Sequence, residues 1–117
     1  MSGAGPLQRL RMLARVSSRP GVVLDQVDFT QPGSGRVPFA GGRFTVVPGA
    51  TSKPDTHDVS ECWMVTGGRG QLSYDGSLWT IEKGDFLFFE PRKTHFVHND
   101  GTEDIVIYTV WWLEHAS

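Results

Sequence analysis

From residue 21 onward the chain consists of short runs of apolar and polar positions that each end at a turn residue. The runs are "VVLDQVDF", "RFTVVPG", "ECWMVTGG", "GQLSYDG", "SLWTIEKGD", "FLFFEPR", "HFVHNDG" and "DIVIYTVWWL". They are rich in Val, Ile, Phe, Tyr and Trp, which favour strands, and glycine, proline, Asn-Asp or Asp-Gly follows each. About eight strands at spacings of roughly ten residues predict an antiparallel all-β sandwich or barrel.

The first 20 residues follow a different pattern. Between Pro6 and Pro20, several apolar side chains fall roughly on one side of a helix: Leu7, Leu10, Met12, Leu13 and Val16. This spacing predicts a short N-terminal helix or a loose arm over residues 1–20, followed by one domain over residues 21–117. The turn-rich stretch "QPGSGRVPFAGG" (residues 31–42) is predicted to be a loop.

Composition narrows the functional classes. A chain of 117 residues with 38% hydrophobic positions can bury one core, and its net charge of −2 gives no general case for binding nucleic acid or acidic membranes. The lone Cys62 excludes an intramolecular disulfide, and no apolar run approaches the ~20 residues that cross a bilayer. Residues 1–20 also lack the apolar centre of a signal peptide. We therefore expect a cytoplasmic protein whose partner is a small molecule.

The candidate chemistry begins in the stretch "PDTHDVSECWMVTGG" (residues 54–68). In a regular strand, alternate side chains face the same way, so one face would carry Asp55, His57, Val59, Glu61, Trp63 and Val65. Polar groups at one end of an otherwise apolar face are expected at the mouth of a barrel that contains a pocket. A neutral imidazole and a carboxylate at this spacing can bind a divalent cation.

A second stretch, "GDFLFFEPRKTHFVHN" (residues 84–99), repeats this arrangement. An apolar strand and a proline corner precede His95, which shares a face with Val97 and Asn99, while His98 faces away and is predicted to lie at the surface. His115, in the C-terminal tail, has the weakest claim of the four histidines. We predict that Trp63, Val65 and Val97 line a substrate pocket beside the metal ligands.

These two stretches resemble the sequence motifs of the cupins, which are small double-stranded β-helix (jelly-roll) barrels. The first cupin motif reads Gly, five residues, His-x-His, three or four residues, Glu, six residues, Gly. This chain reads Gly49, five residues, Asp55-x-His57, three residues, Glu61, six residues, Gly68. The resemblance covers roughly residues 43–112 and implies a cupin barrel.

The second cupin motif reads Gly, five residues, Pro-x-Gly, two residues, His, three residues, Asn. Here the corresponding positions are Gly84, Glu90-x-Arg92, His95 and Asn99. The resemblance therefore implies one divalent metal ion held by His57, Glu61 and His95. Asp55, which replaces the first motif histidine, is a fourth candidate ligand, through water or directly. Glu90 and Arg92 replace the proline and glycine of the second motif.

Several metals and functions remain open. Oxygen ligands shift preference from copper toward Zn, Fe, Mn or Ni, and two histidines with one carboxylate also match the facial triad of non-haem iron oxygenases. A polar mouth without metal is the alternative, but paired buried carboxylates without a cation carry desolvation and repulsion costs. The leading hypothesis is a metal-dependent enzyme acting on a small molecule, with Asp55 or Glu90 as general base.

Other functional classes compete with this hypothesis. A non-catalytic ligand-binding cupin is the second candidate, and a thiol or flavonol dioxygenase is the third. The pattern "D-x-H-x-x-x-E-x-W" with a closing "VWW" is also similar to the cupin portion of hydrazine-forming synthetases, which would make this chain a stand-alone relative.

The two most apolar strands raise a question of orientation. In "DIVIYTVWWL", either Ile105, Ile107, Thr109 and Trp111 or Val106, Tyr108, Val110 and Trp112 face inward, and alternation alone does not choose. In "FLFFE", Phe86 and Phe88 lie on one face and Leu87 and Phe89 on the other. Because both faces are apolar, we expect a second subunit to cover one of them and the protein to be a homodimer.

Overall fold

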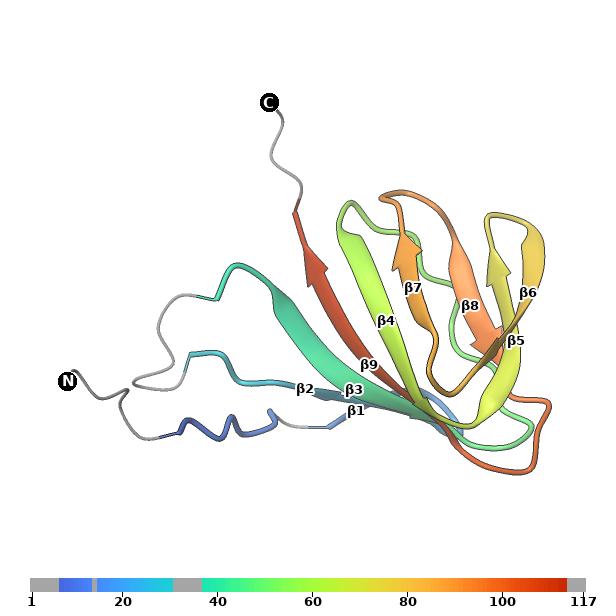
Figure 1. Cartoon of the computed structure of the whole chain (residues 1–117), viewed down its shortest axis with the longest axis horizontal. Helices are drawn as coiled ribbons and strands as arrows, with labels where there is room; N and C mark the ends of the chain where they lie inside the picture. Colours follow the sequence, from blue (N-terminus) through green and yellow to red (C-terminus); the bar gives the residue numbers. More distant parts are fainter. Residues whose placement is uncertain (1–6, 14, 31–36, 114–117) are drawn as a thin grey trace.

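The computed structural model describes residues 7–13, 15–30 and 37–113. Within these ranges the chain forms nine strands and no helix (Figure 1): β1 Val16–Arg19, β2 Val22–Gln26, β3 Ala40–Val46, β4 Ser60–Gly67, β5 Arg69–Tyr74, β6 Ser77–Glu82, β7 Phe86–Phe89, β8 His95–His98 and β9 Ile105–Trp112. The all-β prediction is confirmed. His115 and residues 31–36 of the predicted loop lie outside the described ranges.

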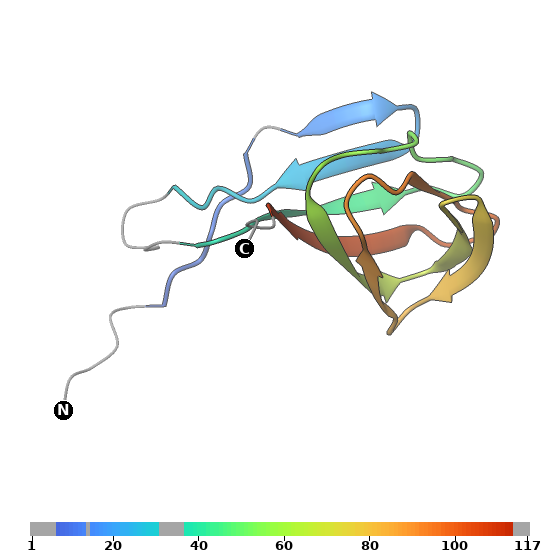
Figure 2. The ribbon, with the colours of Figure 1, turned by 90° about the horizontal axis from the view of Figure 1, so that it is seen from above.

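All strand pairs are antiparallel and belong to two sheets. The larger sheet has the order β1-β2-β3-β9-β4-β7, and the smaller has the order β6-β5-β8. Figure 2 shows β4 to β9 curling into a barrel, while β1 and β2 extend the sheet beyond β3 on one side. This is the jelly-roll or double-stranded β-helix arrangement that the motifs implied.

The described part of the N-terminal segment is extended. Its last residues form β1, which pairs with β2, and Met12 makes an isolated bridge with Val27. Arg15 donates hydrogen bonds to Asp25, which also accepts one from Arg43. These hydrogen bonds, Arg15's first, lower the pKa of Asp25 against the opposing effect of desolvation. The arm expected from the sequence therefore continues the sheet, and the helical alternative is wrong for residues 7–13 and 15–19.

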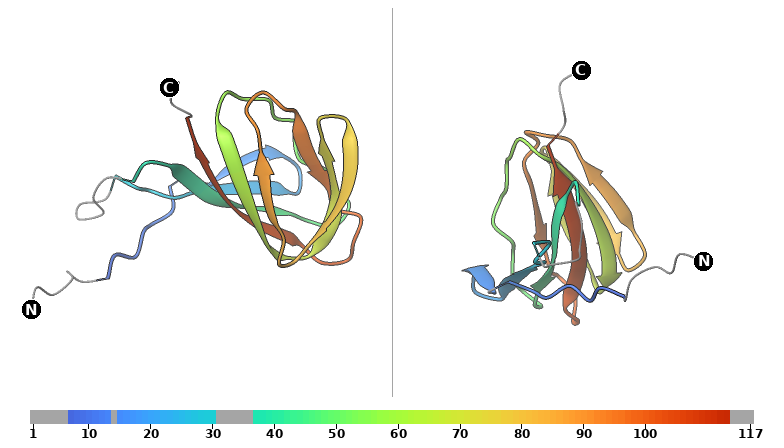
Figure 3. Two further views of the ribbon diagram at one scale, coloured as in Figure 1. Left: turned by 45° about the horizontal axis from the view of Figure 1, so that its top comes forward. Right: turned by 90° about the vertical axis from the view of Figure 1, so that its left-hand side faces the viewer.

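Figure 3 shows the two sheets facing each other across the barrel, and the buried apolar residues that form the core come from both of them. Its inward side chains on β9 are Ile105, Ile107 and Thr109, which settles the orientation that alternation left open. Phe89 is buried while Phe86 and Phe88 are exposed, so β7 is covered on one side only within the described chain. The side chains of Val106, Tyr108, Val110 and Trp112 face outward, on the same side of the sheet as Phe86 and Phe88.

The backbone conformation accounts for the residues found at two positions of the motifs. Gly68 has φ +76°, and a Cβ there would lie 2.3 Å from the carbonyl oxygen of Asp104, so only glycine fits between β4 and β5. Arg92 has φ +63° at the position where the cupin motif has glycine. The left-handed backbone of that corner is therefore kept even though the residue there carries a side chain.

The described ranges contain no helix with the length and hydrophobicity needed to span a membrane.

Candidate metal centre

Three side chains from separate parts of the chain meet at the end of the barrel where β4 and β8 begin. Glu61 is the second residue of β4, His95 is the first of β8, and His57 lies in the segment that leads into β4. One potential ligand atom from each lies within 4.8 Å of the others. Glu61 Oε1 is 3.1 Å from His57 Nε2 and 3.1 Å from His95 Nε2.

The protonation of the two imidazoles decides what this cluster can hold. His57 Nδ1 lies 3.2 Å from the carbonyl oxygen of Val59, and His95 Nδ1 lies 3.2 Å from that of Lys93. A carbonyl only accepts, so each Nδ1 is placed to donate its N–H, and in a neutral ring the Nε2 lone pair then faces the Glu61 oxygen. Two lone pairs facing a carboxylate repel it unless a cation, or an extra proton on each ring, lies among them.

The second oxygen of Glu61 is fixed by neutral donors. Trp63 Nε1 donates to Oε2 at 3.0 Å and Thr109 Oγ1 donates to it at 2.5 Å. Burial works to raise the pKa of Glu61, but the hydrogen bonds from His95, Thr109 and Trp63 outweigh it and hold that pKa below its ordinary value. Glu61 is therefore an ionised carboxylate with its free oxygen turned to the histidines.

Aromatic rings support the buried histidine. The Phe89 ring stacks on His95 with centroids 4.4 Å apart and an angle of 3° between planes, and Trp63 meets His95 edge-on at 5.5 Å. His95 is 2% exposed. Thr109 and Phe89 were not among the predicted site residues. Thr109 stood in one of the two alternating sets considered for β9, and once that set faces inward its hydroxyl must reach the barrel end.

Backbone hydrogen bonds hold the two histidine-bearing segments in place. Asp55 and His95 exchange a pair of backbone hydrogen bonds, both 3.0 Å, which fasten the 50–59 segment to the start of β8. The backbone N–H of Arg92 donates to the carbonyl of His57 at 2.7 Å. The left-handed turn at Arg92 thus helps to set the position of a candidate ligand. The expectation of one regular strand from residue 55 to 65 is wrong, because β4 begins at Ser60.

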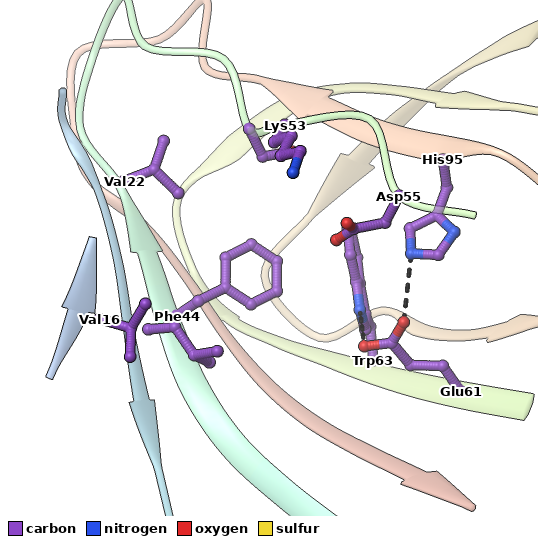
Figure 4. Close-up of a pocket in the computed structure, with 10 residues that line it drawn as sticks. Val16, Val22, Phe44, Lys53, Asp55, Glu61, Trp63 and His95 are labelled. Carbon is purple, nitrogen blue, oxygen red and sulfur yellow. Dashed lines mark hydrogen bonds and ion pairs between the residues drawn. The ribbon is translucent and has the colours of Figure 1, made fainter. Parts of the chain in front are cut away.

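Two adjoining cavities flank the carboxylate and share Leu24, Asp55 and Glu61 in their walls. One, of about 270 Å³, also contacts Trp63 and His95 (Figure 4). The other, of about 360 Å³, also contacts His57, Thr109 and Trp111. The cluster of His57, Glu61 and His95 therefore borders space that a small molecule can occupy.

The remaining predicted residues have varied placements. Asp55 is exposed and lines both cavities, but it is not part of the three-residue cluster. Trp63 lines the first cavity, whereas Val65 and Val97 belong to the buried core and are not among the residues lining either cavity. Glu90 is exposed, and its backbone N–H donates to the Tyr74 hydroxyl.

This donor set fits a divalent metal ion. Metal-bound histidines usually donate their other ring N–H to a carbonyl or carboxylate, as His57 and His95 do, and ligating carboxylates are themselves hydrogen-bonded, as Glu61 is. Two histidines and one carboxylate are a protein ligand set that leaves positions open for substrate or water. A bound ion would also relieve the repulsion between the Nε2 lone pairs and the carboxylate.

Comparison with known proteins agrees with the observed fold. The family model described as "Cupin domain" matches residues 42–111, and the chain belongs to that family. The plu4264 protein from Photorhabdus luminescens is similar, with 23% identity, a TM-score of 0.73, and coverage of 93% of this chain and 88% of that chain.

Two further solved structures have the same fold. A Cupin 2 conserved barrel domain protein from Salinispora arenicola is 27% identical, with a TM-score of 0.68 and coverage of 96% of this chain and 89% of that one. A predicted oxalate decarboxylase from Thermotoga maritima is 19% identical, with a TM-score of 0.71 and coverage of 90% and 94%.

Proposed function

We propose that this protein is a mononuclear metal-dependent cupin enzyme that converts a small molecule in the cavities beside Glu61. The observation that carries the proposal is the convergence of two histidine Nε2 atoms, on rings whose Nδ1 atoms face backbone carbonyls, on one carboxylate oxygen of Glu61. The proposed ion is Zn, Fe, Mn or Ni, as oxygen and imidazole ligands favour. We place the protein in the cytoplasm, where the lone Cys62 stays reduced.

The chemistry follows from the ligand number and the surroundings. A divalent ion on three protein ligands supplies Lewis acidity or an oxygen-activating centre, with positions open toward the cavities. Asp55 lines both cavities and has no side-chain hydrogen bond or ion pair within the described residues. An unpaired, exposed carboxylate in the wall is suited to remove a proton from a bound substrate, and we assign Asp55 that role. Glu90 lines neither cavity, which favours Asp55 over Glu90 as the base.

Elemental analysis tests the proposal directly. The protein purified without chelator is expected to contain about one divalent transition metal ion per chain, because the site offers three ligands and no second cluster of this kind is present in the described residues. The measurement is inductively coupled plasma mass spectrometry on dialysed protein. Protein that remains metal-free after incubation with Zn, Fe(II), Mn and Ni would refute the proposed function, and a redox-inert Zn would exclude a dioxygenase.

We also propose that the protein is a homodimer that pairs through the outer face of β9, β4 and β7. The outward residues of these strands carry no charge: Cys62, Met64, Phe86, Phe88, Tyr108, Val110 and Trp112. Phe86 is 76% exposed, Phe88 is 54% exposed and stacks on Trp112, and Tyr108 is 42% exposed. An aromatic face bordered by one charged residue, Arg43 of β3 beside Tyr108, resembles the apolar centre and polar rim of a protein interface, and a second copy of this face is complementary to it.

The Phe86→Lys variant is expected to be monomeric at concentrations where the natural chain is dimeric, because an ammonium at the centre of an apolar interface loses its hydration. Size-exclusion chromatography with light scattering measures this. Leu78→Lys, on β6 and equally exposed, is the matched control and should leave the dimer intact. A monomeric natural chain, or a dimeric Phe86→Lys variant, would contradict the interface.

A further inference from the structure

The cavity beside His95 has two walls of opposite character. In Figure 4, Val16, Val22 and Phe44 lie on one side, and Asp55, Glu61, Trp63 and His95 lie on the other, with Lys53 above the space between. The apolar wall comes from β1, β2 and β3, whose paired residues Leu24 and Phe44 face inward together. A ligand that fills this cavity must therefore have an apolar part in addition to any group that reaches the metal ligands.

Lys53 is the one lysine or arginine among the residues that line the two cavities. The two basic side chains just before β8 are paired, Lys93 with Asp75 and Arg92 with Asp58. Lys53 has no hydrogen bond or ion pair within the described residues. Its ammonium is therefore available to a ligand at no cost in lost internal contacts.

The charges in the cavity set the charge of the ligand. With a divalent ion on Glu61 and two neutral histidines, the charges of Lys53 and Asp55 cancel, and the cavity keeps one net positive charge. A ligand with a single negative charge neutralises it, and an ion pair shielded by the apolar wall is stronger than one in open water. A neutral or cationic ligand leaves this net positive charge without a counter-charge.

We propose that this cavity binds an amphipathic organic monocarboxylate, whose carboxylate pairs with Lys53 and whose apolar part packs on Val22 and Phe44. This inference rests on the proposed metal-dependent function and narrows its substrate class. A cavity of about 270 Å³, which shares three wall residues with one of about 360 Å³, is near the lower end of the range for small-molecule sites and fits a ligand of modest size. Lys53 is a binding residue in this scheme, and the metal ligands remain as assigned.

The test compares hexanoate with hexanamide, which have nearly the same shape and differ in charge. The zinc-loaded protein is titrated with each, and the indole N–H signal of Trp63 is followed by NMR because that group lies in the cavity wall. The natural chain should bind hexanoate more tightly than hexanamide. Lys53→Met should weaken hexanoate binding about fivefold, equivalent to ~1 kcal/mol for one ion pair, and leave hexanamide unchanged.

Two further variants complete the design. Lys53→Arg should keep the preference for hexanoate, and Lys83→Met, which removes a lysine that lines neither cavity, should behave as the natural chain does. The zinc content of every sample is measured, so a protein that retains no zinc refutes the proposed function. Zinc-loaded protein that ignores hexanoate, or a Lys53→Met variant that keeps the full preference for it, overturns the present inference alone. In the second case the carboxylate is bound by the metal.

Discussion

His95→Ala is expected to lower the affinity for the divalent metal by more than about 100-fold. Loss of a group that only hydrogen-bonds to a metal ligand costs up to about 100-fold, and loss of the ligand itself should cost more. The substitution removes one of only two nitrogen ligands of the cluster and leaves the Glu61 oxygen facing a gap. The neighbouring histidine provides a matched control. His98 lies on the same strand but turns away from the cluster, and its Nδ1 is 2.7 Å from Thr51 Oγ1.

Competition with a chromophoric chelator measures both variants at one pH. His98→Ala should keep the natural affinity within about twofold, because its loss changes neither a ligand nor a residue touching one. Because His95 is buried and the variant loses the ring on which Phe89 stacks, circular dichroism must first show that His95→Ala folds. A folded His95→Ala variant that binds metal with natural affinity would disprove the assigned centre, as would equal losses in the two variants.

Asn99→Ala is expected to lower the free energy of unfolding by ~3 kcal/mol. The side chain is fully buried, and its Nδ2 donates to the carbonyls of Val46 and Glu103 while its Oδ1 accepts from the N–H of Gly101. Alanine leaves these backbone groups without partners, at a cost of roughly 1–3 kcal/mol for each that water does not reach. Urea unfolding with a chelator present measures this without a contribution from bound metal.

The adjacent residue supplies the control for this experiment. Asp100 is exposed and only accepts a side-chain hydrogen bond from Gln71, so Asp100→Ala should change the free energy of unfolding by less than about 0.5 kcal/mol. If Asn99→Ala lowered the free energy of unfolding no more than Asp100→Ala does, the hydrogen bonds of Asn99 would contribute little to the stability of the fold. Because Asn99 touches no residue of the candidate centre, the Asn99→Ala variant should bind metal with the affinity of the natural chain.

Much of the fold followed from local pattern. The Tyr74–Ser77 hairpin was encoded by Asp-Gly, and Asp75 and Gly76 do adopt the positive φ values of 49° and 87° that such a turn needs. Alternation also placed Trp63 and Val65 on one face with Glu61. The inward face of β9 could not be read from its own residues, because both sets are apolar, and only its pairing with β3 and β4 decides it.

The grouping of His57, Glu61 and His95 was predictable because it depends on spacing within two motifs. What the sequence could not supply were the groups that reach the site from distant strands. Thr109 approaches Glu61 across 48 positions of the chain, and the carbonyls that orient the histidines belong to backbone turns that no residue pattern specifies. Cys62 is half-buried on the outer face. The likeness to hydrazine-forming synthetases stays a prediction.

The position of β1 has a consequence for how this barrel can acquire new specificity. Val16, on an outer strand held to its neighbour partly by Arg15 and Asp25, forms part of the wall of a cavity whose chemistry resides on β4 and β8. Substitutions in this four-residue strand would change the shape of the cavity and leave every candidate metal ligand in place. Under the proposed function, selectivity and reactivity are carried by different parts of the chain, and substitutions in the outermost strand would change the first without affecting the second.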